Sequence, residues 1–239
     1  MGIPILFDEI LLNSRISEYI EWLPQEAPHC AIFGATGTGK TYFSKLLLGK
    51  VVLHEPNSQI FVLNFKGDED FSFLDGCDRY FQFDKCRKGL QEFYQLFQAR
   101  QSGEDKGRNM LVMFFDEWAS YCNSISDDKK ILEAEKRKLS NLLMLGRSFR
   151  IHVILSQQRL DASYFNATRD NFSLVVGLGN LSQEAKDMMF SEFKKEMLPN
   201  RRRGTGYMII NGANFRAVVV PQISDWDKLH ITIKNGVTR

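Results

Sequence analysis

A glycine-rich turn between a strand and a helix is the feature that most limits what this chain can fold into. Residues 34–41 read GATGTGKT and match the pattern G-x-x-x-x-G-K-S/T, with the apolar run HCAIF before them and a helical pattern from Lys40 onward. This strand–loop–helix context gives the pattern its meaning. Glycines in such a loop allow the backbone to aim its N–H groups inward at phosphate oxygens. The sequence therefore predicts a loop that cradles the phosphates of a nucleotide.

Each residue of this loop has an expected contact with Mg²⁺-ATP. The predicted nucleotide-binding residues are Gly34, Ala35, Thr36, Gly37, Thr38, Gly39, Lys40, Thr41 and Tyr42. Lys40 is expected to reach the β- and γ-phosphates, and the Thr41 hydroxyl to hold Mg²⁺. The alternative is a plain glycine-rich turn with a surface lysine, which the flanking strand and helix disfavour.

A second apolar strand, LVMFFDEW at 111–118, ends in two adjacent acids. An acid at the end of a buried strand carries a desolvation cost unless it faces a cation. We therefore expect Asp116 to take the Walker-B role at Mg²⁺ and Glu117 to orient the attacking water or accept its proton. A strand end that simply meets solvent is the alternative, and the presence of the phosphate loop favours catalysis.

Several classes of phosphate-loop protein are disfavoured by what the sequence contains. Adjacent acids argue against small-molecule kinases, which transfer to a substrate hydroxyl and need not activate water. The sequence has no N-K-x-D stretch to read guanine and no L-S-G-G-Q signature of ABC transporters. What remains is a hydrolase that turns ATP cleavage into movement.

Strand and helix patterns alternate along the chain, which predicts a mainly parallel sheet covered by helices on both faces. Strands are expected at 58–67, 79–83, 110–118, 151–156 and 172–179, and helices at 40–49, 86–101, 127–149 and from Ser182. A further helix is expected at 8–22, where apolar residues recur at helical spacing. The NGAN stretch between TGYMII and FRAVVV predicts a C-terminal β-hairpin. The fold class is thus α/β, a P-loop NTPase with a mainly parallel central sheet.

Length and composition fit one motor domain over residues 1–239, with a helical extension at 1–27. Lys and Arg number 31 against 29 acids, so a polyanion would have to be bound through a local basic patch. Four cysteines without C-x-x-C spacing indicate a reduced, cytoplasmic protein. No apolar run approaches the roughly 20 residues that span a bilayer.

Four segments, in order, resemble the FtsK/SpoIIIE DNA translocases within the wider FtsK–HerA motor superfamily, which implies a RecA-like fold. They are APHCAIFGATGTGKT, VLNFKGDEDF, GRSFRIHVILSQQR and RRRGTGYMII, and together they extend from about Pro28 to Val220. Two positions depart from the family pattern: Asn64 stands where an Asp is usual, and Leu160 where a Pro would fall.

The resemblance implies two further catalytic residues. Gln158 falls where the family has a glutamine that senses the γ-phosphate, with Gln157 as the alternative. Such motors also use an arginine from a neighbouring subunit to stabilise charge in the transition state. Arg147 is the leading candidate, because its Gly-Arg pair matches the family; the others are Arg150, Arg169, Arg201, Arg202 and Arg203.

The function that the resemblance implies is a Mg²⁺-dependent ATPase that moves double-stranded DNA as a homo-hexameric ring, in plasmid or conjugative transfer. Its expected partners are DNA, copies of itself, and a membrane-anchored, relaxase or virion protein. A viral genome-packaging ATPase is the first alternative, and a module whose ATP merely holds subunits together is the second. Basic stretches at 106–109, 129–138 and 193–203 are candidates for DNA contact, and Lys66 for a functional role.

Overall fold

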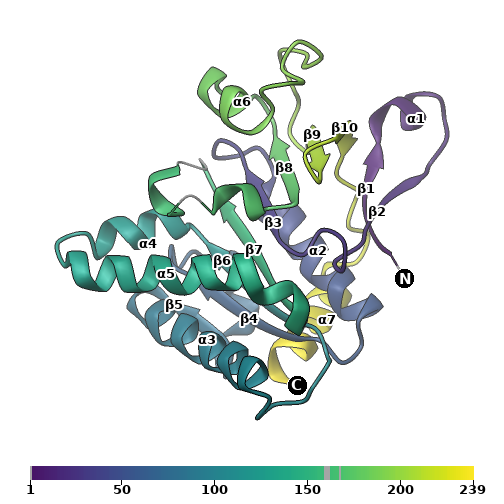
Figure 1. Cartoon of the computed structure of the whole chain (residues 1–239). Coiled ribbons are helices and arrows are strands. Elements are labelled where there is room, and N and C mark those ends of the chain that lie inside the picture. Colours follow the sequence, from purple (N-terminus) through teal and green to yellow (C-terminus); the bar gives the residue numbers. More distant parts are fainter. Residues whose placement is uncertain (1, 159–161, 167) are drawn as a thin grey trace.

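The computed structural model describes residues 2–158, 162–166 and 168–239, and within these ranges ten strands form one sheet (Figure 1). Their order across the sheet is β2-β1-β10-β9-β8-β3-β7-β6-β4-β5. The bounds are β1 Ile3–Asp8, β2 Tyr19–Trp22, β3 Cys30–Phe33, β4 Gln59–Asn64, β5 Tyr80–Gln82, β6 Leu111–Asp116, β7 Ile151–Gln157, β8 Leu174–Leu178, β9 Thr205–Ile210 and β10 Asn214–Val219. In this order, the neighbours within β8-β3-β7-β6-β4-β5 pair in parallel. The neighbours within β2-β1-β10-β9-β8 pair antiparallel. The predicted α/β class is confirmed.

Helices cover both faces of this sheet. The α-helices are α1 Glu9–Asn13, α2 Lys40–His54, α3 Cys86–Ser102, α4 Trp118–Ser124, α5 Lys129–Leu145, α6 Gln183–Met189 and α7 Trp226–Thr238. Short 3₁₀ turns are η1 Glu69–Leu74, η2 Phe83–Lys85, η3 Gly146–Phe149, η4 Ala162–Tyr164 and η5 Arg169–Asn171. Helices α2 and α7 lie on one face, and α3, α4 and α5 lie on the other (Figure 1).

The alternation of side chains in β3 explains the two layers of core. Ala31 and Phe33 point into the core beneath α3 and α5, whereas Cys30 and Ile32 point into the core beneath α2 and α7. Successive residues of a strand face opposite sides, so a strand covered on both faces must be apolar throughout. All of β3 is buried, and so is all of β6. The phosphate loop thus leaves the sheet from its most buried region.

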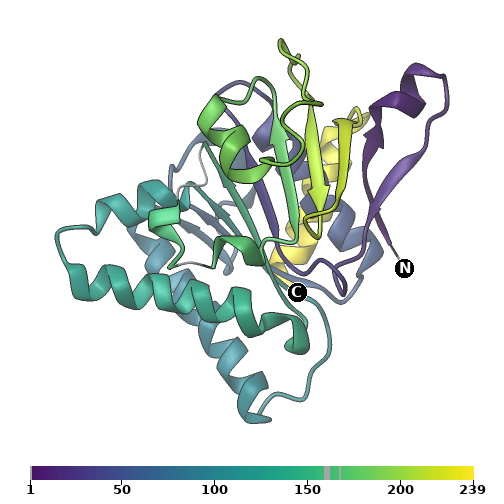
Figure 2. The same cartoon turned by 45° about the horizontal axis from the view of Figure 1, so that its top comes forward.

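The predicted N-terminal helix over 8–22 is wrong. The segment contains the last residue of β1, the five-residue α1 and all of β2, and the hairpin of β1 and β2 stands at the edge of the sheet (Figure 2). Asp8 caps α1 through its side chain, and β1 pairs with β10. Residues 19–22 alternate between exposed and buried, and Trp22 Nε1 donates to the Ala27 carbonyl at 2.6 Å. The extension at 1–27 therefore contains more strand than helix, because pairing with a distant strand outweighs local helical spacing.

The C-terminal part confirms one prediction and adds an element. The hairpin turns at Asn211 and Gly212, whose φ angles of 52° and 70° are both left-handed, as the Asn-Gly pair predicts. Helix α7 follows the last strand and was not predicted; it packs along α2. The four cysteines are buried and free. Among the helices of the described ranges, none has the length and apolar character needed to cross a membrane.

Candidate active site

The carboxyl ends of β3, β4 and β6 meet at one edge of the sheet, beside a cavity of about 400 Å³. Its lining includes six residues of the glycine-rich loop and the start of α2: Thr36, Gly37, Gly39, Lys40, Thr41 and Tyr42. Asp116, the last residue of β6, and Glu117, which follows it, line the same cavity. Ligands of open parallel sheets bind outside these strand ends. The two predicted motifs are therefore brought together at the edge where a nucleotide site is expected.

The loop has the backbone geometry that its glycines allow. Gly34 has a φ of 151°, and a Cβ there would lie 2.4 Å from the Leu178 carbonyl oxygen, so no larger residue fits. Gly39 precedes α2 in a left-handed conformation. Lys40 folds back over the loop, where its Nζ donates to the Gly34 carbonyl at 2.8 Å and the Ala35 carbonyl at 3.2 Å. The lysine ammonium is thus held against the loop at the start of α2.

Lys40 shares the cavity with the two acids. Its side chain is buried, and burial lowers the pKa of its ammonium, while the charges of Glu117 and Asp116 act in the opposite direction. Burial also raises the pKa of Asp116 to about 7, with the neighbouring Glu117 and Asp68 adding to the shift. Desolvated, interacting charges in a cleft are typical of functional sites.

Glu117 is placed by an unusual backbone conformation. Its φ of 62° and ψ of 51° are left-handed, and its N–H donates to the Ser156 carbonyl at 2.7 Å. A non-glycine residue in this region is strained and persists only where its surroundings fix it. The turn joins β6 to α4 and brings the carboxylate into the cavity lining. Burial raises the pKa of Glu117, and the charges of Lys40 and Lys66 oppose that shift.

The segment after β4 adds two acids to the cavity lining that no sequence motif predicted. Lys66, a predicted candidate, lines the cavity together with Asp68 and Asp70. Asn64, the residue that departs from the family pattern, is buried and organises this turn. Its Oδ1 accepts from the Gly67 N–H at 3.0 Å, and its Nδ2 donates to the Asp68 carbonyl at 3.3 Å. The other departure, Leu160, lies outside the described residues.

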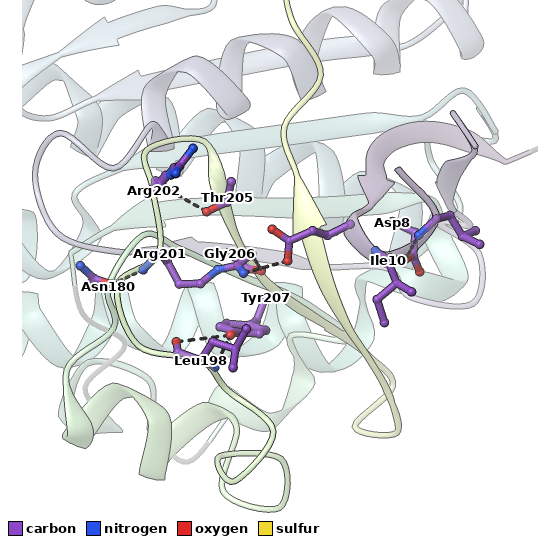
Figure 3. A network of polar contacts seen from close by, with 11 residues as sticks. Asp8, Ile10, Asn180, Leu198, Arg201, Arg202, Thr205, Gly206 and Tyr207 are labelled. Atoms are coloured by element: carbon purple, nitrogen blue, oxygen red, sulfur yellow. Dashed lines mark hydrogen bonds and ion pairs between the residues drawn. The ribbon is translucent and has the colours of Figure 1, made fainter. Parts of the chain in front are cut away.

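The loop before β9 lies against the phosphate loop. Gly204 N donates to the Thr38 carbonyl at 3.0 Å, and Arg203 lines the cavity of its own chain. Arg201 is engaged elsewhere: it contacts Asn180, Gly206 and the Tyr207 ring, as Figure 3 shows, and pairs with Glu9 at 2.8 Å. Arg201 and Arg203, both predicted as arginines for a neighbouring subunit, thus contact their own chain.

Two predicted catalytic residues are not brought to the cavity. Arg147 is exposed in η3, before the amino end of β7, and so lies at the opposite edge of the sheet. Gln158 is exposed just after β7 and is absent from the described lining. Gln157 is buried, and neither atom of its amide is hydrogen-bonded to another described residue.

The oxygen donors at this edge suit Mg²⁺ bound together with a nucleotide. In the described part of the chain, no group of three or more His, Cys, Asp or Glu side chains is arranged to hold a metal. Mg²⁺ usually takes one or two carboxylates and completes its ligands with water and substrate phosphates. The Thr41 hydroxyl and the Asp116 carboxylate line one cavity with the phosphate loop, so these donors fit the ion.

Comparisons of sequence agree with the motifs. The model of the family "Helicase HerA, central domain" matches residues 25–73, which include the phosphate loop. The FtsK domain-containing protein YdcQ of Bacillus subtilis is 27% identical over 93% of this chain. The aligned region is 49% of YdcQ, so the chain spans about half the length of this curated relative.

Solved structures agree on the fold. The pCW3 conjugation coupling protein TcpA, with ATPγS, is similar with a TM-score of 0.75 and 18% identity, over 98% of this chain and 70% of TcpA. The genome-packaging NTPase B204 of Sulfolobus turreted icosahedral virus 2, with ATPγS, gives a TM-score of 0.56 and 13% identity, over 84% of this chain and all of B204. Motifs, sequence matches and fold together confirm the resemblance that the sequence indicated.

Proposed function

Since this chain is similar to the FtsK- and HerA-type P-loop ATPases, we propose that it is a Mg²⁺-dependent ATPase motor that moves double-stranded DNA. The observation that carries the proposal is the shared cavity of Lys40, Thr41, Asp116 and Glu117. We assign residues 1–239 to a single motor domain that works in the cytoplasm. The curated relative is about twice as long, and the activity and partners of the whole protein are part of the proposal.

Binding of ATP follows from the phosphate loop. The N–H groups between Gly34 and Tyr42 would donate to the phosphate oxygens, because a loop that opens a helix concentrates such donors. Lys40 would exchange the Gly34 and Ala35 carbonyls for the β- and γ-phosphates. Thr41 and Asp116 would hold Mg²⁺, which when bound offsets phosphate charge. The Asp116 carboxylate must be ionised for this, so binding should weaken below about pH 7.

Hydrolysis needs a group that activates water, and Glu117 has the position for it. Its carboxylate follows Asp116 and lines the cavity beside Lys40. A general base works best when its pKa approaches the working pH, and burial raises the pKa of Glu117 in that direction. Glu117 would take a proton from the attacking water, and Lys40 and Arg203 would stabilise the charge that develops on the phosphate.

We place the ATPase in a homo-hexameric ring that threads DNA, with Arg147 acting on the neighbour's nucleotide. Its exposed position at the far edge of the sheet suits a residue that serves another subunit. Conjugative or plasmid DNA transfer is the favoured role, supported by the fold shared with a conjugation coupling protein over most of both chains. A membrane-anchored or relaxase protein would then be the partner.

Viral genome packaging is the second candidate, and one observation favours it. The packaging NTPase B204 is matched over its whole length by 84% of this chain, so the fold of that protein lies within the fold of this chain. A virion-associated partner would distinguish this role from conjugation. A module that uses ATP only to hold subunits together is a weaker alternative, because it has no need of Glu117.

Steady-state ATPase activity with and without linear duplex DNA tests the proposal. We expect DNA to stimulate turnover at low salt, and Lys40→Ala to weaken nucleotide affinity at least about tenfold, since it removes a buried cation. An ATPase turnover rate that is the same with and without DNA would favour the assembly module. Unchanged nucleotide affinity in Lys40→Ala would exclude the loop as the phosphate site.

The ring itself is tested by dilution and by mixing. Specific activity should rise with protein concentration, and DNA should shift that rise to lower concentration. Arg147→Ala should lose turnover but keep nucleotide binding, and mixing it with Glu117→Gln subunits should restore part of the activity. Constant specific activity over a hundredfold dilution, with a monomeric mass throughout, would exclude the ring.

A further inference from the structure

An exposed tryptophan lies in the same cavity as the phosphate loop. Trp226, the first residue of α7, lines the cavity together with Thr36 and Lys40, and 39% of its surface is exposed. The other two tryptophans of the chain, Trp22 and Trp118, are completely buried. The Trp226 ring is thus open to a ligand that enters the cavity, and an aromatic ring offers such a ligand a large apolar face.

The ring of Trp226 is held in place by the start of α2. Tyr42 meets it edge-on, with ring centroids 5.3 Å apart and planes at 82°. The Tyr42 hydroxyl accepts a hydrogen bond from the N–H of Ile223, in the segment that leads into α7. His230, one turn along α7, lies 5.7 Å from Trp226. Trp226 is thus fixed next to Tyr42, which directly follows the proposed Mg²⁺ ligand Thr41.

Helix α7 is itself fixed against α2 by close packing. Leu229 and Ile233 lie over Gly49 of α2, where a Cβ would come within 2.2 Å of Leu229 Cδ1. Gly236 of α7 allows the same close approach to Val52. Because α2 begins in the phosphate loop, this packing gives Trp226 a set position relative to the phosphates.

We propose that Trp226, with Tyr42 against it, is the surface on which the nucleobase of ATP stacks. This inference rests on the proposed nucleotide-binding function and deepens it. The acids and Lys40 occupy the part of the cavity that suits phosphates and Mg²⁺, whereas the base is the flat aromatic part of the ligand. Tyr42 and Trp226 are the aromatic side chains of the cavity lining. Stacking accepts any base, because every base has a π-face.

Lys45 does not compete for this role. Its Nζ lies 5.6 Å from the Trp226 ring, but it pairs with Asp70 at 3.1 Å. The ion pair keeps the lysine beside the ring, and the tryptophan retains its exposed surface.

Calorimetric titration with Mg²⁺-ADP and with Mg²⁺-pyrophosphate separates the base from the phosphates. In Trp226→Ala we expect about tenfold weaker ADP binding, the loss typical of one stacked base, and pyrophosphate binding within twofold of the wild type. Trp226→Phe keeps a ring and should recover most of the affinity. Ile231→Ala, an exposed residue of the same helix, is the matched control and should leave both affinities unchanged.

Fluorescence gives an independent measurement, because Trp226 is the exposed tryptophan. ADP should quench its emission, pyrophosphate should not, and Trp226→Phe should lose the response. Equal ADP affinity in wild type and Trp226→Ala, or an equal loss for ADP and pyrophosphate, overturns the stacking proposal while leaving the phosphate site intact. Failure of the wild type to bind either ligand overturns the proposed function itself.

Discussion

The parallel and antiparallel parts of the sheet supply the cavity in different ways. In the parallel part, each contribution follows directly from a strand: the phosphate loop after β3, Lys66 and Asp68 after β4, and the acid pair after β6. In the antiparallel part, β1 and β10 come from opposite ends of the chain and pair at Phe7 and Val219. This part brings Arg203 to the cavity, from the loop before β9.

This difference shows that the groups proposed for the chemistry and the contacts that position the Arg203 loop come from different parts of the sheet. Local segments hold the groups that would bind phosphate and activate water. The antiparallel part ties one loop to the site through Gly204 and Thr38, and secures that loop through Arg201 and Glu9. A change in the parallel part should therefore remove a chemical step, whereas a change in the antiparallel part should weaken it.

Glu117→Gln is the sharpest test of the parallel part. The change keeps the shape of the side chain but removes its proton acceptor, so turnover should fall at least about a hundredfold. ATP should still bind, as measured by calorimetry. Glu133→Gln, an exposed acid on α5, is the control and should keep wild-type turnover. Multiple turnovers at the normal rate in Glu117→Gln would exclude Glu117 as the base.

Arg203→Ala tests the antiparallel part, with a smaller expected effect. Removal of a guanidinium that would contact phosphate should lower kcat/KM for ATP about tenfold to a hundredfold, the range of a hydrogen bond to a charged group. Arg202→Ala is the matched control, because Arg202 is exposed and lies outside the described lining. Equal effects of the two substitutions would show that Arg203 contributes only general surface charge.

The motifs of the parallel part could be predicted because they are local. Four consecutive residues, Gly39, Lys40, Thr41 and Tyr42, form the end of the loop and the start of α2, and all line the cavity. The place of Asp116 in the cavity lining could be predicted, because an acid at the end of a buried strand is costly unless it faces a cation. Arg147 stays a prediction: the Gly-Arg pair precedes β7, away from the cavity of its own chain, and its proposed target is the nucleotide of a neighbouring subunit.

The rest depended on pairing between distant parts of the chain. Helical spacing at 8–22 was misleading, although Tyr19, Ile20 and Trp22 are aromatic or β-branched residues, which favour a strand. Asp225 is an N-cap signal for α7, and Leu229 and Ile233 have helical spacing, so this helix was detectable. The contacts of Trp226 with the loop were not, because they follow from the packing of α7 on α2.

Glu9→Gln should weaken the link between the N-terminal hairpin and the Arg203 loop. The Glu9–Arg201 pair is largely buried, at 2.8 Å, and the amide keeps one hydrogen bond while losing the charge. We expect the melting temperature to fall by about 2–4 °C, the shift for roughly 1 kcal/mol in a domain of this size. Affinity for Mg²⁺-ATP should fall no more than about threefold. Glu26→Gln, an exposed acid beyond the hairpin, is the control.

Asp116→Asn should change the melting temperature in the opposite direction, and only where the Asp116 carboxyl is ionised. Burial raises the pKa of Asp116 to about 7 in the folded chain, above its ordinary value of 3.8. Between these two values the folded state holds a proton that the unfolded state has released, so stability decreases as the pH rises from about 4 to about 7. At pH 8 the buried carboxylate is ionised and the cost is complete. Without Mg²⁺ or nucleotide, Asp116→Asn should then melt a few degrees above the wild type. The difference should shrink as the pH falls towards 5, because the wild type regains its proton. Thermal melts at pH 8 and pH 5 measure both, and a gain that is constant across this range would show that the Asp116 carboxyl does not titrate there. The Asp116 carboxyl would then be held by local contacts at no cost in stability. The buried acid of the parallel part would in that case resemble the Glu9–Arg201 pair of the antiparallel part, which does not reduce the stability of the fold.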